Sequence, residues 1–302
     1  MFYRRKVILA LLQIFDGELD KIRFQKLLFL FAQRQAKAVY DFIPYKFGCY
    51  SYSANADMNV LASRGMLYET PTCFKLVMSN TVSKANKTDY LKQLKPVDRK
   101  ILLEIKSACG NMSATALMKH TYVNFPFYAI KSEAVEKILS RKELENINII
   151  KPKSNEPVLF TIGYEGITLE EYLVRLIKHD VKVLVDVRNN PVSMKFGFSK
   201  NHLKRYCESL GINYVHIPEV GIQSDQRQEL NTQADYDKLF ILYCRNNLKK
   251  TKIEQKKILN LLIVYERIAL ACFEADISKC HRKHLAEAIK ELPGDTFKVK
   301  HI

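Results

Sequence analysis

Residues 156–191 read EPVLFTIGYEGITLEEYLVRLIKHDVKVLVDVRNNP, and this stretch decides the fold of the second half of the chain. Two apolar runs, PVLFTIGY (157–164) and VKVLVDV (181–187), have the length and composition of buried β-strands. Between them, TLEEYLVRLIKH (168–179) has apolar residues at helical spacing, and Thr168 begins a capping-box pattern at its start. A strand, a helix and a second strand in this order predict two parallel strands joined by a crossover helix.

The same alternation continues through the rest of the second half. The further predicted elements are a helix over 199–207, a strand at 212–218, helices from about Tyr236 and about Lys252, a strand at 267–273, a helix over 281–292 and an edge strand at 296–302. Strands separated by helices predict a doubly wound, mainly parallel sheet and therefore an α/β fold. Upstream, Pro152 and Pro157 interrupt a polar stretch, which predicts a boundary between a domain over 1–150 and a domain over 151–302.

The first half is predicted to be mostly helical. KIRFQKLLFLFAQRQ (21–35) and SANADMNVLASRGMLYET (53–70) contain apolar residues at helical spacing, and Gly65 marks the end of the second helix. After it, MLYET and CFKLVMS (73–79) flank Pro71 as the strands of a short β-hairpin would. Helices followed by a short hairpin predict a winged-helix-like domain, which is a common module for docking to nucleic acid or to a protein.

The chain is strongly basic, because 48 Lys and Arg residues against 32 Asp and Glu residues give a formal net charge of +16. An excess of this size favours a polyanionic partner, which is most often nucleic acid. The alternative is that the charge serves general solubility and has no specific partner. We expect nucleic acid to be the main partner and a protein partner to dock through the N-terminal domain.

Cysteine usage and hydropathy bear on the compartment. The 7 cysteines are an odd number without paired spacing, which argues against a disulfide framework and for a reducing compartment. No stretch approaches the roughly 20 uninterrupted apolar residues that a membrane-spanning helix needs. We therefore expect a cytoplasmic protein with no membrane partner.

A candidate site lies at the carboxyl ends of the predicted strands, where ligands bind in sheets of this kind whatever the chemistry. The interiors of these strands are apolar, yet each end carries polar or reactive groups. The residues at the four ends are Gly163, Tyr164 and Glu165; Asp186, Arg188 and Asn189; His216 and Glu219; and Cys272, Glu274, Cys280, His281 and Arg282. Four such ends predict one ligand site, with Gly163, Tyr164, Glu165 and Asn189 among the ligand-binding residues.

Two cysteines are the candidate nucleophiles. Cys280 precedes a predicted helix and stands beside an imidazole and a guanidinium, and such surroundings lower the pKa of a thiol. His281 is then the candidate acid or base, although adjacent residues rarely point in the same direction. Cys272 is the second candidate nucleophile, and the alternative is that it is a small buried core residue.

The charged residues at the same strand ends have predicted roles as well. Arg188 and Arg282 are expected to clamp a phosphate or carboxylate in bidentate fashion. Glu274 and Asp186 are expected to supply acid–base capacity, but Asp186 and Arg188 could instead pair with each other as a structural bridge. The spacing of cysteine and histidine over 272–284 matches no common zinc pattern, so no metal site is predicted and no cofactor is assigned.

The second half resembles a known family. Four separated motifs carry the resemblance: TIGYEG with TLEEYL, LVDVRNNPVS, LGINYVHIPEVG, and ALACFE followed by CHRKHLAEAI. Together, in this order and over residues 158–291, they are similar to the domain-of-unknown-function 488 family. The resemblance implies no particular reaction. The hallmark T-I-G-Y, D-V-R-x-x-P and C-x-E…C-H-R motifs of that family fall on the strand ends that chain order and polarity had already picked out.

The first half resembles a second family. FQKLLFLF, IPYKFGCYSY and ANADMNVLASRGML are similar, over roughly residues 1–80, to the SocA/Panacea-type antitoxin-related domain. Cys49 stands where members of that family usually have a proline in the aromatic turn. The resemblance implies a role in defence or toxin–antitoxin settings, with a protein or DNA as the docked partner.

One basic segment of the second half contains interspersed aromatic residues. KFGFSKNHLKRY (195–206) places Lys195, Lys200, Lys204 and Arg205 among two phenylalanines and a tyrosine. The basic groups could bind phosphates while the rings stack on exposed bases. The alternative, which has equal support, is that the phenylalanines cover the sheet and the lysines are solvated.

These observations predict a nucleic-acid-associated protein whose α/β domain binds a phosphate-bearing ligand, such as a nucleotide or a nucleic-acid end, and has groups that could process it. Two alternatives stay open. One is a non-catalytic DNA- or protein-binding regulator in a defence or toxin–antitoxin setting. The other is a small-molecule enzyme with a cysteine nucleophile, so the sequence does not decide whether the protein is an enzyme.

Overall fold

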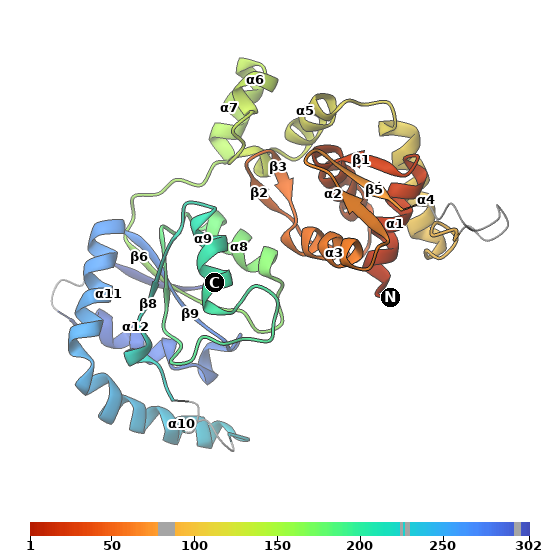
Figure 1. Ribbon diagram of the computed structural model, residues 1–302. Coiled ribbons are helices and arrows are strands. Elements are labelled where there is room, and N and C mark those ends of the chain that lie inside the picture. The colour runs from red at the N-terminus through yellow and green to blue at the C-terminus, as the bar shows by residue number, and fades with distance from the viewer. Residues whose placement is uncertain (78–87, 224–225, 227–229, 293–296) are drawn as a thin grey trace. The chain divides into compact units, whose positions relative to one another are not determined.

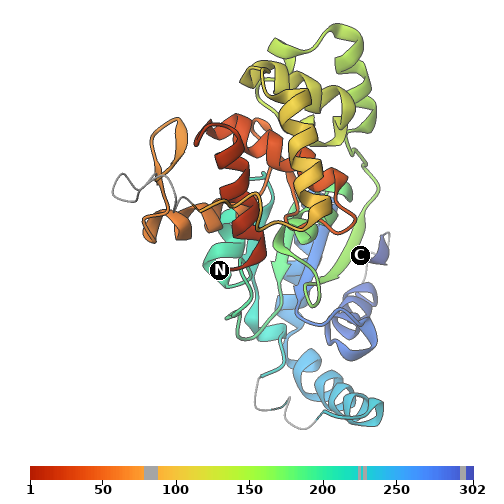
Figure 2. The same ribbon diagram turned by 90° about the vertical axis from the view of Figure 1, so that its right-hand side faces the viewer.

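The computed structural model describes residues 1–77, 88–223, 226, 230–292 and 297–302 (Figure 1 and Figure 2). The chain forms two compact units, Met1–Lys151 and Pro152–Ile302, which we call unit 1 and unit 2. Each unit has its own apolar core. Among the described residues, no helix is both long enough and apolar enough to cross a membrane.

Unit 1 is mostly helical. Its helices are α1 (Tyr3–Ile14), α2 (Lys21–Arg34), α3 (Tyr52–Ser63), α4 (Pro96–Cys109), α5 (Ala114–Asn124), α6 (Val135–Ile138) and α7 (Arg141–Ile150), with a 3-10 helix at Pro126–Ala129. Its strands are β1 (Glu18–Asp20), β2 (Ile43–Tyr45), β3 (Gly48–Tyr50), β4 (Leu67–Glu69) and β5 (Cys73–Leu76). β2 and β3 form an antiparallel hairpin of their own. The predicted helical character of the first half is confirmed.

The remaining strands of unit 1 form a wing beside the helices. β4 and β5 are an antiparallel hairpin, and β5 also pairs with β1, so the sheet order is β1-β5-β4. Helices α2 and α3 begin where side chains cap them, because Asp20 accepts from the N–H of Arg23 and Ser51 accepts from the N–H of Ala54. This arrangement is the predicted winged-helix-like one. The end of the predicted hairpin, 78–79, lies outside the described residues.

Unit 2 alternates strands and helices. The elements are β6 (Val158–Gly163), α8 (Leu169–Lys178), β7 (Val183–Asp186), α9 (Lys200–Glu208), β8 (Asn213–His216), α10 (Gln233–Leu242), a π-helix (Tyr243–Leu248), α11 (Lys252–Tyr265), β9 (Arg267–Cys272), α12 (Arg282–Lys290) and β10 (Lys298–His301). Short 3-10 helices lie at Pro218–Val220 and Ile277–Lys279. The five strands are all parallel, in the order β10-β6-β9-β7-β8, which confirms the predicted α/β fold.

Helices cover both faces of this sheet. Side chains on alternate strand positions, Leu159, Val183, Val185, Ile268 and Leu270, share one apolar cluster with residues of α11 and α12. Figure 1 shows α8 and α9 on the opposite side of the sheet, where α8 buries its apolar stripe. Because both faces are covered, β6 and β9 are buried at every residue, and this explains their continuous apolar sequences.

Candidate functional site

The carboxyl end of β9 is a topological switch point of the sheet. β9 lies between β6 and β7, but its crossover helix α12 packs on the opposite face from α8 and α9, the crossover helices of β6 and β7. The loops that leave β6 and β7 therefore run to one face of the sheet, and the loop that leaves β9 between them runs to the other face. In open α/β sheets, loops that part in this way leave a crevice for a ligand. A cavity of about 350 Å³ opens at this point, and we call it the thiol cavity. Its lining includes Tyr164, Arg188, Asn189, Ser193, Cys272 and His281.

A hydrogen bond determines which ring nitrogen of His281 faces the two cysteines. Its Nε2 lies 3.2 Å from the carbonyl oxygen of Val187, which can only accept a hydrogen bond. In the neutral imidazole, Nε2 therefore carries the proton and Nδ1 is the acceptor. Nδ1 lies 3.7 Å from Sγ of Cys272 and 4.0 Å from Sγ of Cys280. A thiol–imidazole pair is thus present, and Cys272 with His281 opens onto the cavity.

Cys272 has a second acceptor close by. Its Sγ donates to Oε2 of Glu274 at 3.1 Å, so an imidazole and a carboxylate both lie beside this thiol. Cys272 is the last residue of β9, and Glu274 follows in the loop that leads to α12. The structure brings together four of the five predicted catalytic residues, because Cys280 also lies beside His281, while Asp186 lies apart in a pair with Arg188.

Cys280 differs from its prediction. Burial raises the pKa of its thiol well above the usual range, and the neighbouring Cys272 and Glu274 add to this rise. The charge of Arg282 acts in the other direction but is the weaker influence. The expected lowering of the pKa of Cys280 is therefore wrong, because the side chain is fully buried and the cost of desolvating a thiolate there outweighs the attraction of nearby cations. Cys272 is also buried, at 2 % exposed, but it lines the thiol cavity and Cys280 does not, so Cys272 is the better placed candidate nucleophile.

Asp186 and Arg188 form a buried network. Nε of Arg188 donates to Oδ1 of Asp186 at 2.8 Å, and Nη2 donates to Oδ2 at 2.5 Å. Nη1 donates to the hydroxyl of Tyr164 at 3.0 Å and to the carbonyl of Phe198 at 2.9 Å, while the hydroxyl of Tyr214 donates to Asp186 at 2.5 Å. Burial alone would lower the pKa of Arg188, but the charge and hydrogen bonds of Asp186 raise it. The pair has the geometry of the structural bridge that was the alternative interpretation.

Arg282 has a different set of partners. Arg282 is 2 % exposed, and its guanidinium donates to the backbone carbonyls of Glu274 at 2.5 Å and Ala275 at 3.3 Å, and to the hydroxyl of Thr161 at 3.4 Å. No carboxylate of the described residues is within ion-pair distance of it. Arg282 therefore holds the loop after β9 in place and leaves a buried positive charge near the cysteines.

Gly163 and Glu165 also shape that loop. A Cβ atom at Gly163 would lie 1.9 Å from the carbonyl oxygen of Glu274, so only glycine permits this approach of the two backbones. The N–H of Glu165 donates to the carbonyl of Phe273 at 2.9 Å, and its carboxylate accepts from the N–H of Ala275 at 3.0 Å. These two predicted ligand-binding residues thus position the loop that carries Glu274.

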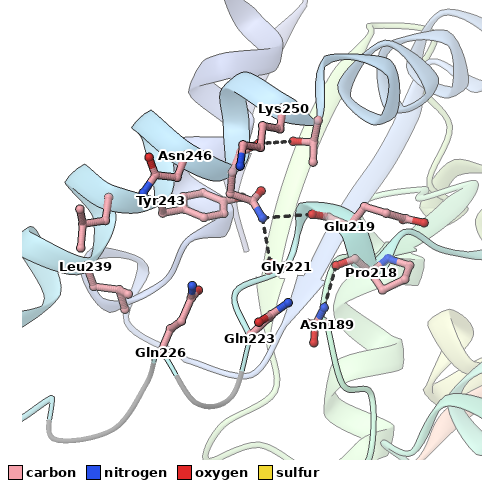
Figure 3. A pocket seen from close by; sticks show the side chains of 13 residues that line it. Asn189, Pro218, Glu219, Gly221, Gln223, Gln226, Leu239, Tyr243, Asn246 and Lys250 are labelled. Atoms are coloured by element: carbon pink, nitrogen blue, oxygen red, sulfur yellow. Dashed lines mark hydrogen bonds between the residues drawn. The ribbon is translucent and has the colours of Figure 1, made fainter.

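Asn189 borders a second cavity, which sequence reasoning missed. This cavity of about 730 Å³ lies against the π-helix and is called the amide cavity here (Figure 3). Its lining includes Asn189, Gln223, Tyr243, Asn246, Asn247 and Lys250. The hydroxyl of Tyr243 donates to the carbonyl of Val220, and its ring packs edge-on against His281 at 5.5 Å. Apolar periodicity cannot reveal a π-helix, so sequence reasoning reached Asn189 and Glu219 of this lining only as strand-end residues.

The four predicted nucleic-acid-binding residues lie in two places. Nζ of Lys195 donates to the carbonyl of Tyr164, beside the thiol cavity, and burial lowers the pKa of Lys195. Lys200 begins α9 and approaches the ring of His216, at the end of β8. The other two lie further along α9, where Lys204 pairs with Glu208 and Arg205 stacks on the ring of Tyr206.

The cysteines and histidine could also hold a metal ion. The ligand atoms of Cys272, Cys280 and His281 lie within 4.8 Å of one another, and all three residues are buried. Two thiolates and an imidazole suit zinc, which prefers four ligands in a tetrahedron. The hydrogen bond from His281 to Val187 is also of the kind that orients metal-bound histidines.

Comparison with known proteins supports the family resemblance of unit 2. Residues 168–289 match the family described as "Domain of unknown function DUF488". The match includes Asp186, Arg188 and the whole segment from Cys272 to Arg282, but it begins after Tyr164 and the TIGYEG motif and does not reach unit 1. No curated protein matches the chain. The resemblance of the first half to SocA/Panacea-type domains stays a prediction.

Proposed function

We propose that unit 2 is an enzyme domain in which Cys272 is the nucleophile and His281 takes its proton. The observation that carries this proposal is the orientation of His281. The Val187 carbonyl accepts from Nε2, and this leaves Nδ1 to face the sulfur of Cys272 at 3.7 Å. Both residues line a cavity at the switch point of the sheet, which is where ligands enter folds of this kind.

The chemistry follows from these positions. The single thiol proton of Cys272, which is directed at Oε2 of Glu274 at 3.1 Å, turns to Nδ1 of His281 and is transferred there, and the sulfur attacks an electrophilic atom of the ligand. As the new bond to sulfur forms, the bond to the leaving group breaks and takes its electron pair to that group. The imidazolium then gives its proton to the leaving group. The buried charge of Arg282 favours the thiolate, and attack by water on the covalent intermediate releases the second product and restores the thiol.

The ligand class that we propose is a phosphate-bearing one, namely a nucleotide or a nucleic-acid end. The net charge of +16 supports it, since such an excess attracts polyanions. Lys195 lies beside the thiol cavity, and three large apolar side chains near it, Val192, Met194 and Phe196, are exposed. Exposed apolar and aromatic groups next to a cation suit unpaired bases joined to phosphates.

Protection of Cys272 from alkylation tests this function. The full chain is treated with iodoacetamide near neutral pH, and modification of each cysteine is followed by peptide mass spectrometry. The probes are a short single-stranded oligonucleotide with a terminal phosphate, the same oligonucleotide without it, and inorganic phosphate. We expect the phosphorylated oligonucleotide to slow modification of Cys272 and to lose this effect as salt is raised. Equal rates with and without every probe would contradict the ligand class and favour a non-catalytic docking role.

A zinc centre is the second candidate, because three ligand atoms already converge. Cobalt(II) is the probe, since its thiolate complexes absorb in the near ultraviolet and its tetrahedral complexes absorb strongly in the visible. A zinc centre predicts both absorptions on titration of the metal-free full chain, weakened charge-transfer absorption in Cys280→Ser, and no change in the control Cys73→Ser. If cobalt gives no such spectrum while Cys272 alkylates rapidly, the thiol nucleophile stands and the zinc centre is excluded.

A further inference from the structure

Unit 1 contains a cavity that the proposed function of unit 2 does not use. It has a volume of about 320 Å³ and lies between the start of α2, the β2–β3 hairpin and the wing. We call it the lysine cavity, because three lysines and several aromatic rings line it. Its cationic and aromatic lining residues include Lys21, Lys26, Lys46, Tyr45, Tyr50 and Phe74. They come largely from the two stretches, FQKLLFLF and IPYKFGCYSY, that the sequence had marked in the first half.

Lys26 is a buried cation at the wall of this cavity. It is 1 % exposed, and its Nζ donates to the backbone carbonyls of Phe47 and Cys49. No carboxylate of the described residues is within ion-pair distance of it. Burial lowers the pKa of Lys26, which reflects the cost of keeping an ammonium group away from water. An anion that entered the cavity would offset that cost.

Two further lysines of the lining are each paired with a carboxylate, Lys21 with Glu69 and Lys46 with Glu133 at 3.6 Å. The cavity faces the first turns of α2, where helix N–H groups and the dipole favour negative charge. Lys21 already pairs with the carboxylate of Glu69 at 2.5 Å. A carboxylate of the protein itself therefore occupies the rim, which shows the kind of group that this wall accepts.

The rest of the lining is apolar and aromatic. The rings of Tyr45 and Tyr50 lie 5.1 Å apart and tilted, and Phe74 closes the side formed by the wing. A volume of this size is at the lower end for ligand sites, so it suits one side chain and does not suit a stretch of polymer backbone. The lining therefore suits a single compact ligand group that contains both a negative charge and an apolar part.

We propose that the lysine cavity binds an acidic peptide end, with a carboxylate directed at Lys26 and an apolar side chain against Tyr45, Tyr50 and Phe74. The partner is then a protein that presents a terminal carboxylate next to an aromatic or aliphatic residue. This site belongs to unit 1 alone and is independent of the thiol chemistry of unit 2. Its test can fail or succeed whatever Cys272 does.

The probe is N-acetylphenylalanine, which carries a free carboxylate and an aromatic ring, and its amide is the matched neutral compound. Binding to the full chain is measured by ligand-observed NMR. The variants are Lys26→Met, which removes the charge, and Ile22→Trp, which fills the cavity from a half-buried position on α2. Lys37→Met, an exposed residue outside the lining, is the control. Thermal unfolding confirms that each variant is folded.

We expect the acid to bind about tenfold more tightly than the amide, because a charge-assisted hydrogen bond is lost in the amide. Ile22→Trp should abolish binding, Lys26→Met should remove the preference for the acid, and Lys37→Met should change neither. The proposal is overturned if the acid and the amide bind equally, if the acid does not bind, or if Ile22→Trp binds as the wild type does. Tighter binding of phenyl phosphate than of the acid would overturn the choice of a carboxylate.

Discussion

Arg188 and Arg282 are both almost fully buried at the strand ends of unit 2, but they are held in different ways. Arg188 is paired with the carboxylate of Asp186, and its charge is neutralised where it stands. Arg282 is bonded to the carbonyls of Glu274 and Ala275 and to a hydroxyl, so its charge is solvated but not neutralised. The comparison separates two uses of the same side chain.

The first use is structural and the second is electrostatic. A neutralised pair such as Asp186 with Arg188 fixes the end of β7 and adds little net field to the cavity. An unneutralised guanidinium stabilises negative charge nearby, and the charge of Arg282 opposes the rise in the pKa of the Cys280 thiol. We therefore expect that breaking the Asp186–Arg188 pair chiefly lowers the free energy of unfolding. Removing the charge of Arg282 should chiefly lower the alkylation rate of Cys272.

The largest expected effect is that of Asp186→Asn. The substitution leaves the buried cation of Arg188 without its counter-charge, and breaking one partner of a buried pair costs about 3–5 kcal/mol. We expect the unfolding transition of unit 2 in urea to move to much lower denaturant. Glu208→Gln, which breaks the exposed contact with Lys204, should leave it nearly unchanged. A small shift in Asp186→Asn would mean that the pair does not hold the fold.

The next largest effect is expected for Gly163→Ala. The new Cβ would lie 1.9 Å from the carbonyl oxygen of Glu274, so backbone must move, and overpacking of this kind costs about 1–3 kcal/mol. The displaced loop carries Glu274 and the partners of Arg282, so alkylation of Cys272 should change as well. Gly166→Ala is the matched control, because no atom lies within 4 Å of its new Cβ and only its φ of +76° is strained. It should lower stability without altering Cys272.

Arg282→Met and Arg282→Lys separate the charge of Arg282 from its hydrogen bonds. Methionine leaves the part-buried carbonyls of Glu274 and Ala275 without this donor, which costs at most about 1–3 kcal/mol, and it removes the charge. Lysine keeps the charge with fewer donors. We expect the alkylation rate of Cys272 to fall in Arg282→Met and to be largely retained in Arg282→Lys. If both variants react as the wild type does, the charge of Arg282 has no electrostatic role at the thiol.

The smallest effect is a dependence of stability on alkaline pH. Burial raises the pKa of Cys280 and of Cys207 above the ordinary value of 9.0. Above that pH the unfolded chain loses thiol protons that the folded chain keeps, so the stability that these thiols contribute is lost as pH rises. Each thiol should contribute up to about 1.4 kcal/mol per pH unit above pH 9.0.

Unfolding by urea in reducing buffer, measured on either side of that pH, checks this slope. Cys280→Ala and Cys207→Ala should each flatten it. An unchanged slope in both variants would assign the alkaline loss of stability to other groups.

Sequence reasoning succeeded where a local pattern determines the structure. Continuous apolar runs marked β6, β7 and β9 because each is buried on both faces. The pairing of Asp186 with Arg188 was open to prediction as well, since residues two apart at a strand end point to the same side. The winged-helix-like order of unit 1 followed from helices that precede a short hairpin.

Other features depend on tertiary structure. The placement of β9 between β6 and β7 follows from how the crossovers pack, so the switch point could not be located in the sequence. The burial of Cys280 comes from the path of the loop before α12, and the sequence showed only its helix-start position. The partners of Arg282 include backbone carbonyls of the same loop. Because every residue has a carbonyl, the sequence does not indicate which ones accept from Arg282.

The role of His281 as the base that deprotonates Cys272 is tested by the pH dependence of Cys272 alkylation in the wild type and in His281→Gln. Glutamine can still donate to the Val187 carbonyl, but it cannot take up the thiol proton at neutral pH. We expect wild-type Cys272 to react near neutral pH and faster than Cys280, and His281→Gln to lower this rate by about tenfold or more and to move the profile to higher pH. Identical profiles in the two proteins, or a Cys272 that reacts no faster than Cys280, would contradict the assignment of Cys272 and His281 as nucleophile and base.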